Sequence, residues 1–317
     1  SESDLAIVKQ DWQIIIDKIK AGKAHEISEG DTMYLAACTK GANAKSMRKQ
    51  PFSDIPAKQR AYSLKNSYMT AYIRRILMNE DVISVFKPEE LKSKSVDELL
   101  HERFAPYIGC TLYELKHHIN FAENKNKAMY ANLVSDLLGI KGTSLDDTEE
   151  FAKANIKFKT IRLEPNGVPR EHMSFEQIDF DRWLNASWEE SQVYETFENT
   201  KFLFVVFQFT ETERENPNRV PYLKGIKLWN MPEQIIETEL KNLWQTVHDI
   251  LAVGVELTQT PRGVKNNLPG AKFNGVCHIR PKAANAADKV RLPDCQMITK
   301  QTYWLNREYI AEIVREL

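Results

Sequence analysis

The chain has 317 residues, of which 42% are hydrophobic and 27% charged, with a formal net charge of −1. This composition is typical of a globular protein of one to three domains, and no apolar run approaches the roughly 18 residues that span a membrane. The sequence shows no signal-peptide pattern, and its four cysteines lie too far apart for a CxxC pair, so we expect free thiols and a cytoplasmic location.

A passage of about 75 residues occurs twice, near the start and near the end of the chain. Order and spacing are kept, apart from about ten additional residues in one loop of the second copy. The matching segments are Asp11–Asp17, Cys38–Ala44 and Tyr62–Tyr68 in the first copy, and Leu243–Asp249, Arg280–Ala286 and Tyr303–Tyr309 in the second. Each copy has the pattern of a helix, a strand, a loop and a second helix.

In the first copy, the apolar spacing predicts a helix over 5–21 that Gly22 ends, a strand over 33–38 and a helix over 65–78. The mildly acidic residues 79–94, which include a Pro-Glu-Glu sequence, are interpreted as a linker. The helices expected after it cover 96–107, 112–120 and 127–138.

The remaining elements predict a sheet followed by the second copy of the repeat. Strands are expected over 156–163, 201–209 and 223–228. The second copy then supplies a helix over 232–253, a strand over 275–279 and a helix over 307–316. This order gives an α/β (α+β) domain of about 220 residues with a mixed central sheet, and the first copy corresponds only to its last third.

Basic residues gather on the repeated unit although the net charge is close to zero. Residues 31–75 contain nine Lys or Arg against two acids, and residues 261–300 contain eight against two. Such segregation is typical of a surface that binds phosphate groups. A solvated basic surface is the alternative that charge by itself leaves open.

Several motifs resemble, in the same order, those of the MutH family, which includes the GATC nicking endonuclease of mismatch repair and the Sau-three-A-I type restriction enzymes. These are the Arg-Pro-Lys-Ala-Ala-Asn-Ala loop at 280–286, Thr-Leu-Tyr-Glu-Leu at 111–115, Lys-Thr-Ile at 159–161 and Leu-Trp-Asn-Met-Pro-Glu at 228–233. The resemblance covers about 95–315, and again 4–78 for the partial copy. It implies a restriction-endonuclease-like core.

In the family, an Asp and a Glu hold Mg²⁺, and a Lys two residues after the Glu activates the attacking water. Carboxylate oxygens suit this hard cation, which lowers the pKa of its bound water. The matching positions here are degenerate: Lys157 stands at the Glu, Glu150 at the Asp, Ser135 at a helical Glu, and Lys159 alone keeps the family's residue.

Lys157 places a positive charge where the metal needs a negative one. Two close ammonium groups repel a divalent cation by an energy on the order of several kcal/mol. We therefore expect no intact catalytic site and no cofactor in this fragment, and Mg²⁺ in the parent enzyme. Lys157 and Lys159 are either the exposed side of an alternating strand or phosphate contacts, and the acidic run 146–150 is a solvated charge run or a metal site.

The resemblance also assigns residues that read DNA. In the second copy these are Arg280, Lys282, Asn285 and Trp304. The first copy offers Lys40, Asn43 and Tyr62, although Cys38-Thr39 replaces Arg-Pro there and Ser63 stands at the aromatic position. Lys or Arg can pair with guanine and Asn with adenine in the major groove. The alternatives are surface charge for the cations and core packing for Trp304.

Together these features predict the C-terminal part of a two-site type II restriction enzyme that recognises double-stranded GATC. Residues 1–78 would be the remnant of an upstream catalytic domain, 79–94 a linker, and 95–317 a complete domain that binds DNA as an allosteric effector. The partners expected are GATC-containing DNA and the upstream catalytic domain. Two alternatives stay open: a nicking endonuclease with a metal site rearranged around Glu150, and a scaffold that only supports dimerisation.

Overall fold

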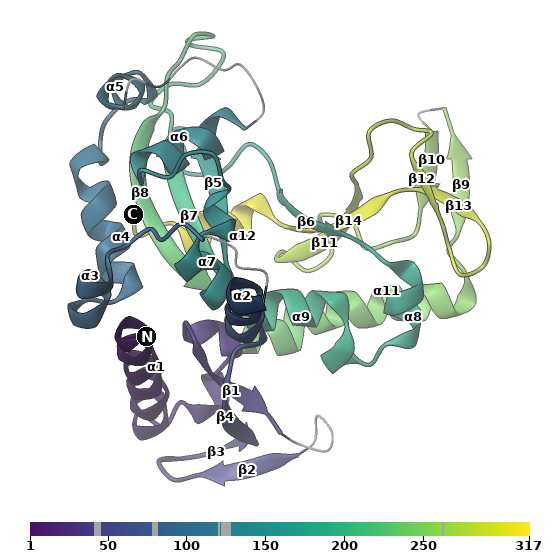
Figure 1. Cartoon of the computed structure of the whole chain (residues 1–317). Helices are drawn as coiled ribbons and strands as arrows, with labels where there is room; N and C mark the ends of the chain where they lie inside the picture. The colour runs from purple at the N-terminus through teal and green to yellow at the C-terminus, as the bar shows by residue number, and fades with distance from the viewer. Residues whose placement is uncertain (41–45, 78–81, 120, 122–127, 262) are drawn as a thin grey trace. The chain divides into compact units, whose positions relative to one another are not determined.

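The structure is a computed structural model that describes residues 1–40, 46–77, 82–119, 121, 128–261 and 263–317. Contacts divide the chain into two compact units. Unit 1 comprises residues 1–167 and 198–233 with Leu317, and unit 2 comprises residues 168–197 and 234–316 (Figure 1). No helix in the described ranges combines the length and the apolar character that crossing a membrane requires.

Unit 1 is built around a mixed sheet in the order β5 (Ile156–Leu163), β7 (Lys201–Gln208), β8 (Tyr222–Asn230). β7 runs parallel to β5 and antiparallel to β8. The apolar run Phe202–Phe207 is at most 1% exposed along its length. A strand buried on both faces requires such an uninterrupted run, which explains why β7 occupies the centre of the sheet.

The helices described between residues 88 and 154 of unit 1 are α3 (Pro88–Ser93), α4 (Val96–Phe104), α5 (Leu112–His118), α6 (Met129–Leu137) and α7 (Glu149–Ala154). Capping boxes at Ser95 and Thr111 start α4 and α5. Leu99, Leu115 and Leu133 are fully buried in one core cluster with the sheet. α4, α5 and α6 lie within the three ranges that were expected to be helical.

The first copy of the repeat belongs to unit 1. It consists of α1 (Glu2–Lys20), two 3-10 turns (Ala24–Glu26 and Glu29–Asp31), β1 (Leu35–Thr39), β2 (Met47–Gln50), β3 (Ser53–Lys58), β4 (Arg60–Leu64) and α2 (Asn66–Leu77). β1 pairs with β4, and the β2–β3 hairpin lies between them in sequence. Ile7, Met33 and Tyr34 are buried in the same cluster as the central sheet.

Unit 2 begins with β6 (Met173–Gln177), α8 (Phe180–Asn185), a 3-10 turn (Trp188–Glu190) and most of α9 (Gln192–Asn199). α10 (Glu233–Ile235), a π-helical turn (Ile236–Leu240) and α11 (Lys241–Val253) follow. The strands are β9 (Leu257–Thr260), β10 (Gly263–Asn266), β11 (Cys277–Pro281), β12 (Lys289–Arg291), β13 (Met297–Thr299) and β14 (Gln301–Leu305), and α12 (Arg307–Ile313) is last.

The two copies share one strand pairing and one register. β11 pairs antiparallel with β14 around the β12–β13 hairpin, as β1 pairs with β4 around β2–β3. The corresponding residue pairs are Leu35–Leu64 with Cys277–Leu305, Ala36–Ser63 with His278–Trp304, and Ala37–Tyr62 with Ile279–Tyr303. The position of Trp304 is therefore taken by Ser63 in the first copy, whereas Tyr62 corresponds to Tyr303 on the opposite face.

The residues expected to form a linker do not behave as one. α3 lies within 79–94, and Phe86 and Leu91 are buried in the core of unit 1. Pro88 can start a helix because the first turn needs no intrahelical N–H donor. The Pro-Glu-Glu sequence therefore marks a helix start, and residues 1–78 fold into the same unit as the residues after them.

Candidate nucleic-acid interface

Arg280, Lys282 and Trp304 lie together on one face of the β11–β14 strand pair. The guanidinium carbon of Arg280 is 5.8 Å, and the ammonium nitrogen of Lys282 is 6.0 Å, from the centroid of the Trp304 ring. Trp304 Nε1 donates a hydrogen bond of 3.1 Å to the carbonyl oxygen of Arg280. The indole is thus fixed to the neighbouring strand, with two cations attracted to its ring. We call these three residues the basic–aromatic triad.

The cations of the triad remain available for an anionic ligand. In the described part of the chain, neither Arg280 nor Lys282 pairs with a carboxylate, and Lys282 Nζ donates to Ser174 Oγ at 2.7 Å. Both residues are exposed. A hydroxyl partner orients the lysine without neutralising its charge.

The loop that follows β11 is tied at both ends. Lys282 N donates to the carbonyl oxygen of Lys300 at 3.0 Å. Asp288 accepts from Ala284 N at 3.0 Å and pairs with Lys300 at 2.7 Å, and this lysine holds the pKa of Asp288 below its usual value. The predicted reader Asn285 is exposed at the tip, where its Oδ1 accepts from Ala287 N at 2.9 Å.

A buried histidine, His278, lies directly opposite Trp304 on the neighbouring strand. It is 1% exposed, and its ring stacks on Trp304 with centroids 6.4 Å apart. Asn306 donates through Nδ2 to Ala271 O, so its Oδ1 must accept from His278 Nδ1, 2.5 Å away. Burial lowers the pKa of His278 to about 4, and the imidazole is neutral at pH 7. Sequence reasoning missed His278, because a single histidine in a strand has no metal or catalytic spacing.

The readers expected in the first copy have a different setting. Lys40 is exposed, and its N–H donates to Gln59 O at 2.8 Å, as Lys282 donates to Lys300. Asn43 lies outside the described residues. Tyr62 is exposed, but it lies on the strand face opposite to that of Ser63. Among the described members of the predicted set, Arg280, Lys282 and Trp304 are brought together, and Asn285 lies further along the same loop.

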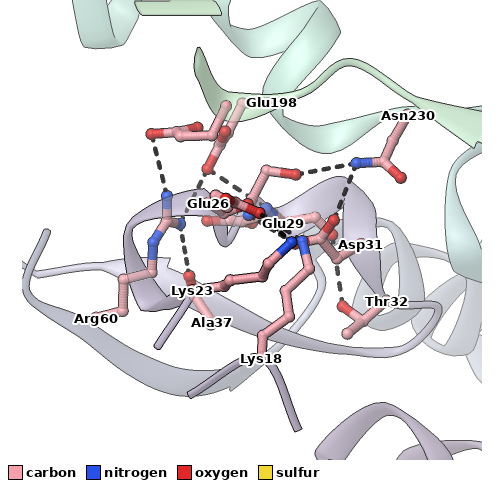
Figure 2. A network of polar contacts seen from close by, with 12 residues as sticks. Lys18, Lys23, Glu26, Glu29, Asp31, Thr32, Ala37, Arg60, Glu198 and Asn230 are labelled. Atoms are coloured by element: carbon pink, nitrogen blue, oxygen red, sulfur yellow. Dashed lines mark hydrogen bonds and ion pairs between the residues drawn. The ribbon is translucent and has the colours of Figure 1, made fainter. Parts of the chain in front are cut away.

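The basic stretch of the first copy turns partly inward, contrary to the expected phosphate-binding face. Arg60 Nη1 donates to Ala37 O at 2.8 Å and to Glu198 Oε1 at 3.0 Å (Figure 2). Lys58 pairs with Glu233 at 2.7 Å, and the fully buried Lys65 donates to Thr32 O at 2.8 Å. Buried cations need such partners. These charges therefore attach the first copy to the rest of unit 1.

A second part of the same network joins α1 and the 3-10 turn to the end of β8. Lys18 pairs with Asp31 at 2.7 Å, and Asn230 Nδ2 donates to the other Asp31 oxygen at 3.1 Å (Figure 2). The backbone of Gly30 lies so close to Asn230 that a Cβ added at residue 30 would be 2.9 Å from Asn230 Cβ. The first copy is thus seated on the strand ends of unit 1 by polar contacts.

Glu150, which stands at the family's metal-binding Asp, has a structural role. It is 2% exposed, and its carboxylate accepts hydrogen bonds from Ser84 Oγ, from Val85 N at 2.9 Å and from Phe86 N at 3.4 Å. Burial raises its pKa. The interpretation of 146–150 as a solvated charge run is wrong for this residue, whose carboxylate is needed to satisfy the buried amides of 85–86.

The other degenerate positions do not fit a magnesium site. Lys157 Nζ lies 3.9 Å from Asp146 Oδ2, while Asp146 Oδ1 accepts from Phe158 N at 2.8 Å. Lys159 also acts electrostatically on Asp146. Ser135 Oγ donates back along α6 to Ala131 O at 3.0 Å. The described residues contain no group of three or more His, Cys, Asp or Glu side chains that could hold a metal ion.

Comparisons with known proteins identify relatives of this chain. A family model described as the DNA mismatch repair enzyme MutH matches residues 138–243, which contain all three strands of the unit 1 sheet. The type II restriction enzyme Sau3AI of Staphylococcus aureus is 38% identical over 354 aligned residues, covering 99% of this chain and 71% of that enzyme. MutH of Actinobacillus pleuropneumoniae is 25% identical, covering 70% of this chain and 94% of the relative. MutH of Vibrio campbellii is 28% identical, with shares of 63% and 81%.

Proposed function

The chain belongs to the family of MutH and the type II restriction enzyme Sau3AI, with its restriction-endonuclease-like mixed α/β fold, and from this premise we propose that residues 95–317 bind double-stranded DNA containing GATC. The basic–aromatic triad carries the proposal. It presents two cations that have no carboxylate partner among the described residues on a hydrogen-bonded strand pair, beside a loop whose ends are fixed.

The chemistry of these side chains suits the edges of bases. Arg280 and Lys282 can donate to guanine O6 and N7, and Asn285 can pair with adenine N6 and N7 in the major groove. Trp304 keeps both cations on one side of the strands. Other exposed lysines of unit 2, such as Lys272, would add attraction to phosphates without sequence preference.

We further propose that this domain binds its target without cutting it. Lys157 and the hydrogen-bonded, buried Glu150 are incompatible with a magnesium site. Hydrolysis with Mg²⁺ is then the task of an upstream domain of the same parent chain, to which residues 1–78 belong. The second domain would act as an allosteric effector at a second GATC site, where tethering supplies a high local concentration and linkage couples the two sites.

The test measures DNA binding by fluorescence anisotropy, with a GATC duplex and a duplex of permuted sequence at several salt concentrations. Lys282→Ala should lose about 1–3 kcal/mol of binding to GATC and most of the preference over the permuted duplex. Lys272→Ala removes the same charge from another exposed site of unit 2, and should weaken both duplexes equally. Equal effects of the two variants would reject sequence reading by the triad. Absence of binding at every salt concentration would favour the dimerisation scaffold.

A further inference from the structure

Exposed apolar side chains are concentrated on the first copy. Among the described residues, thirteen of the twenty large hydrophobic side chains classed as exposed lie within residues 1–77. They come from α1, the β2–β3 hairpin, β4 and α2. Monomeric proteins rarely leave apolar surface clustered in this way, so the feature points to a binding surface.

The second copy shows what covers the corresponding positions. Trp12 of α1 is 46% exposed, whereas its counterpart Trp244 of α11 is 6% exposed. Trp244 packs on Trp188, with ring centroids 5.6 Å apart, and Trp188 in turn packs on Tyr194 at 5.2 Å. Both covering residues belong to segment 168–197, which precedes the repeated passage in unit 2.

Tyr62 and Tyr303 give the same contrast on the strand pair. Tyr62 is 51% exposed and Tyr303 is 1% exposed. The Tyr303 ring contacts Phe175, Trp183 and Phe197 at centroid distances of 5.8 to 6.2 Å. All three aromatic rings again come from segment 168–197, so one contiguous segment covers both positions in the second copy.

The two copies also differ in whether the outer edge of their strand pair is covered by a further strand. β14 has two neighbours, β11 and β6, whereas β4 pairs only with β1 among the described strands. β6 lies in the same segment 168–197. An unpaired strand edge offers backbone donors and acceptors to an added strand.

A cavity of about 290 Å³ lies in the first copy, on the face of the β1–β4 strand pair that carries Ala37 and Tyr62. It is distinct from a cavity of about 440 Å³ elsewhere in unit 1. Its apolar lining includes Ile15, Ile19, Ala37 and Tyr62. In the second copy, the counterparts Val247, Leu251, Ile279 and Tyr303 are buried. The cavity thus occupies the side of the strand pair that the aromatic rings cover in the second copy.

We propose that Trp12, Tyr62, the free edge of β4 and this cavity form a docking face for a strand-and-helix segment built like residues 168–197. The segment would add a strand antiparallel to β4 and place aromatic side chains in the cavity. Its source would be a part of a longer polypeptide outside these 317 residues. The proposal rests on the tandem-domain part of the proposed function, but not on DNA reading by the triad.

The probe is a recombinant fragment of Sau3AI comprising the part of that enzyme outside the 71% that this chain matches. Titration calorimetry with the full 317-residue chain should give a 1:1 complex. Tyr62→Ser should raise its dissociation constant about tenfold or more, because aromatic anchors dominate such interfaces. Tyr113→Ser, which removes another exposed tyrosine of unit 1, should leave binding unchanged.

Three outcomes would overturn the docking face: no complex, equal effects of the two serine variants, or a dimer of this chain that Tyr62→Ser disrupts in sedimentation equilibrium. Anisotropy with the GATC duplex is recorded on the same samples. An unchanged urea unfolding midpoint shows that unit 1 of Tyr62→Ser is folded. Retained DNA binding by the same variant separates failure of the docking face from failure of the DNA-binding proposal.

Discussion

At the scale of single residues, burial decides which polar side chains are structural and which remain free to bind a ligand. Arg280 and Lys282 are charged and exposed at the surface, whereas the buried carboxylate of Glu150 accepts hydrogen bonds from three donors of the protein. His278 shows the same principle for a neutral group. Its Nε2 is buried without a hydrogen-bond partner in the described structure, so protonation would place an unsolvated charge beside Trp304.

The state of His278 gives a prediction of pH dependence. Its pKa falls from 6.5 to about 4 on folding, so the unfolded chain binds the proton more tightly. Stability should be complete above pH 6.5 and should decrease as the pH falls from 6.5 towards 4. His172, in ring contact at 4.6 Å, has a pKa lowered in the same direction.

Urea unfolding between pH 4.5 and 7.5 checks this. The loss of unfolding free energy at low pH should shrink in His278→Gln, which can still donate to Asn306. His101→Gln, at an exposed position on α4, is the matched control and should follow the unsubstituted chain. An unchanged pH profile in His278→Gln would contradict the prediction.

At the scale of elements, the two copies show how one helix–strand–hairpin–helix passage serves two surroundings. The register of β1–β4 equals that of β11–β14, yet the basic–aromatic triad of the second copy has no matching set among the described residues of the first. There Ala36 and Ser63 replace His278 and Trp304. The cations of β3 and β4 are used instead in buried ion pairs with Glu198 and Glu233. Burial is the largest cause that raises the pKa of Glu198, and the negative charge of the nearby Glu233 raises it further. The positive charge of Arg60 acts in the opposite direction.

Arg60→Ala should destabilise unit 1 by about 3–5 kcal/mol, because two buried carboxylates would lose their shared partner. Arg48→Ala, on the exposed β2, is the control and should change the unfolding free energy by less than about 0.5 kcal/mol. Urea titrations of both variants, followed by tryptophan fluorescence, measure the difference. If Arg60→Ala does not fold, Arg60→Lys keeps the charge and should show a smaller loss. Equal stability of Arg60→Ala and Arg48→Ala would refute a structural role for the ion pairs.

At the scale of the whole molecule, the second-copy residues that match the family's DNA-reading positions and those that match its metal-binding positions belong to different units. The triad and its loop are in unit 2, whereas the degenerate positions are in unit 1. In the described part of the chain, Arg280 and Lys282 of unit 2 have no carboxylate partner, whereas Lys157 and Ser135 of unit 1 stand where a metal would need carboxylates. Binding and hydrolysis can therefore be tested independently in this chain.

Removal of metal should leave DNA binding intact. We expect the dissociation constant for the GATC duplex to be the same in Mg²⁺ and in EDTA, and a GATC plasmid to remain supercoiled after incubation with Mg²⁺. Agarose gels and anisotropy record the two results. Nicking that depends on Mg²⁺ and is lost in Glu150→Gln, which retains an acceptor for the buried amides, would establish the rearranged nickase instead.

The sequence by itself determined the repeat, the family, the mixed α/β fold, most helices and the three strands of the central sheet. These depend on local periodicity and on motifs spaced along the chain: β5 spans the expected 156–163. It did not predict the hairpins, the strand β6 that completes the unit 2 sheet, or the helix inside the expected linker. Short polar strands have little periodicity of their own, because neighbouring strands stabilise them.

Only the tertiary structure decided the roles of the charged residues. Sequence placed Arg60, Lys65 and Arg280 in equally basic stretches, yet the first two are buried against unit 1 and the third is exposed beside Trp304. It also placed Tyr62 on the strand face opposite to that of Ser63 and revealed the buried His278 beside Trp304. The reason is physical: whether a side chain is solvated, paired or free depends on residues far away in the sequence, which only folding brings within a few ångströms.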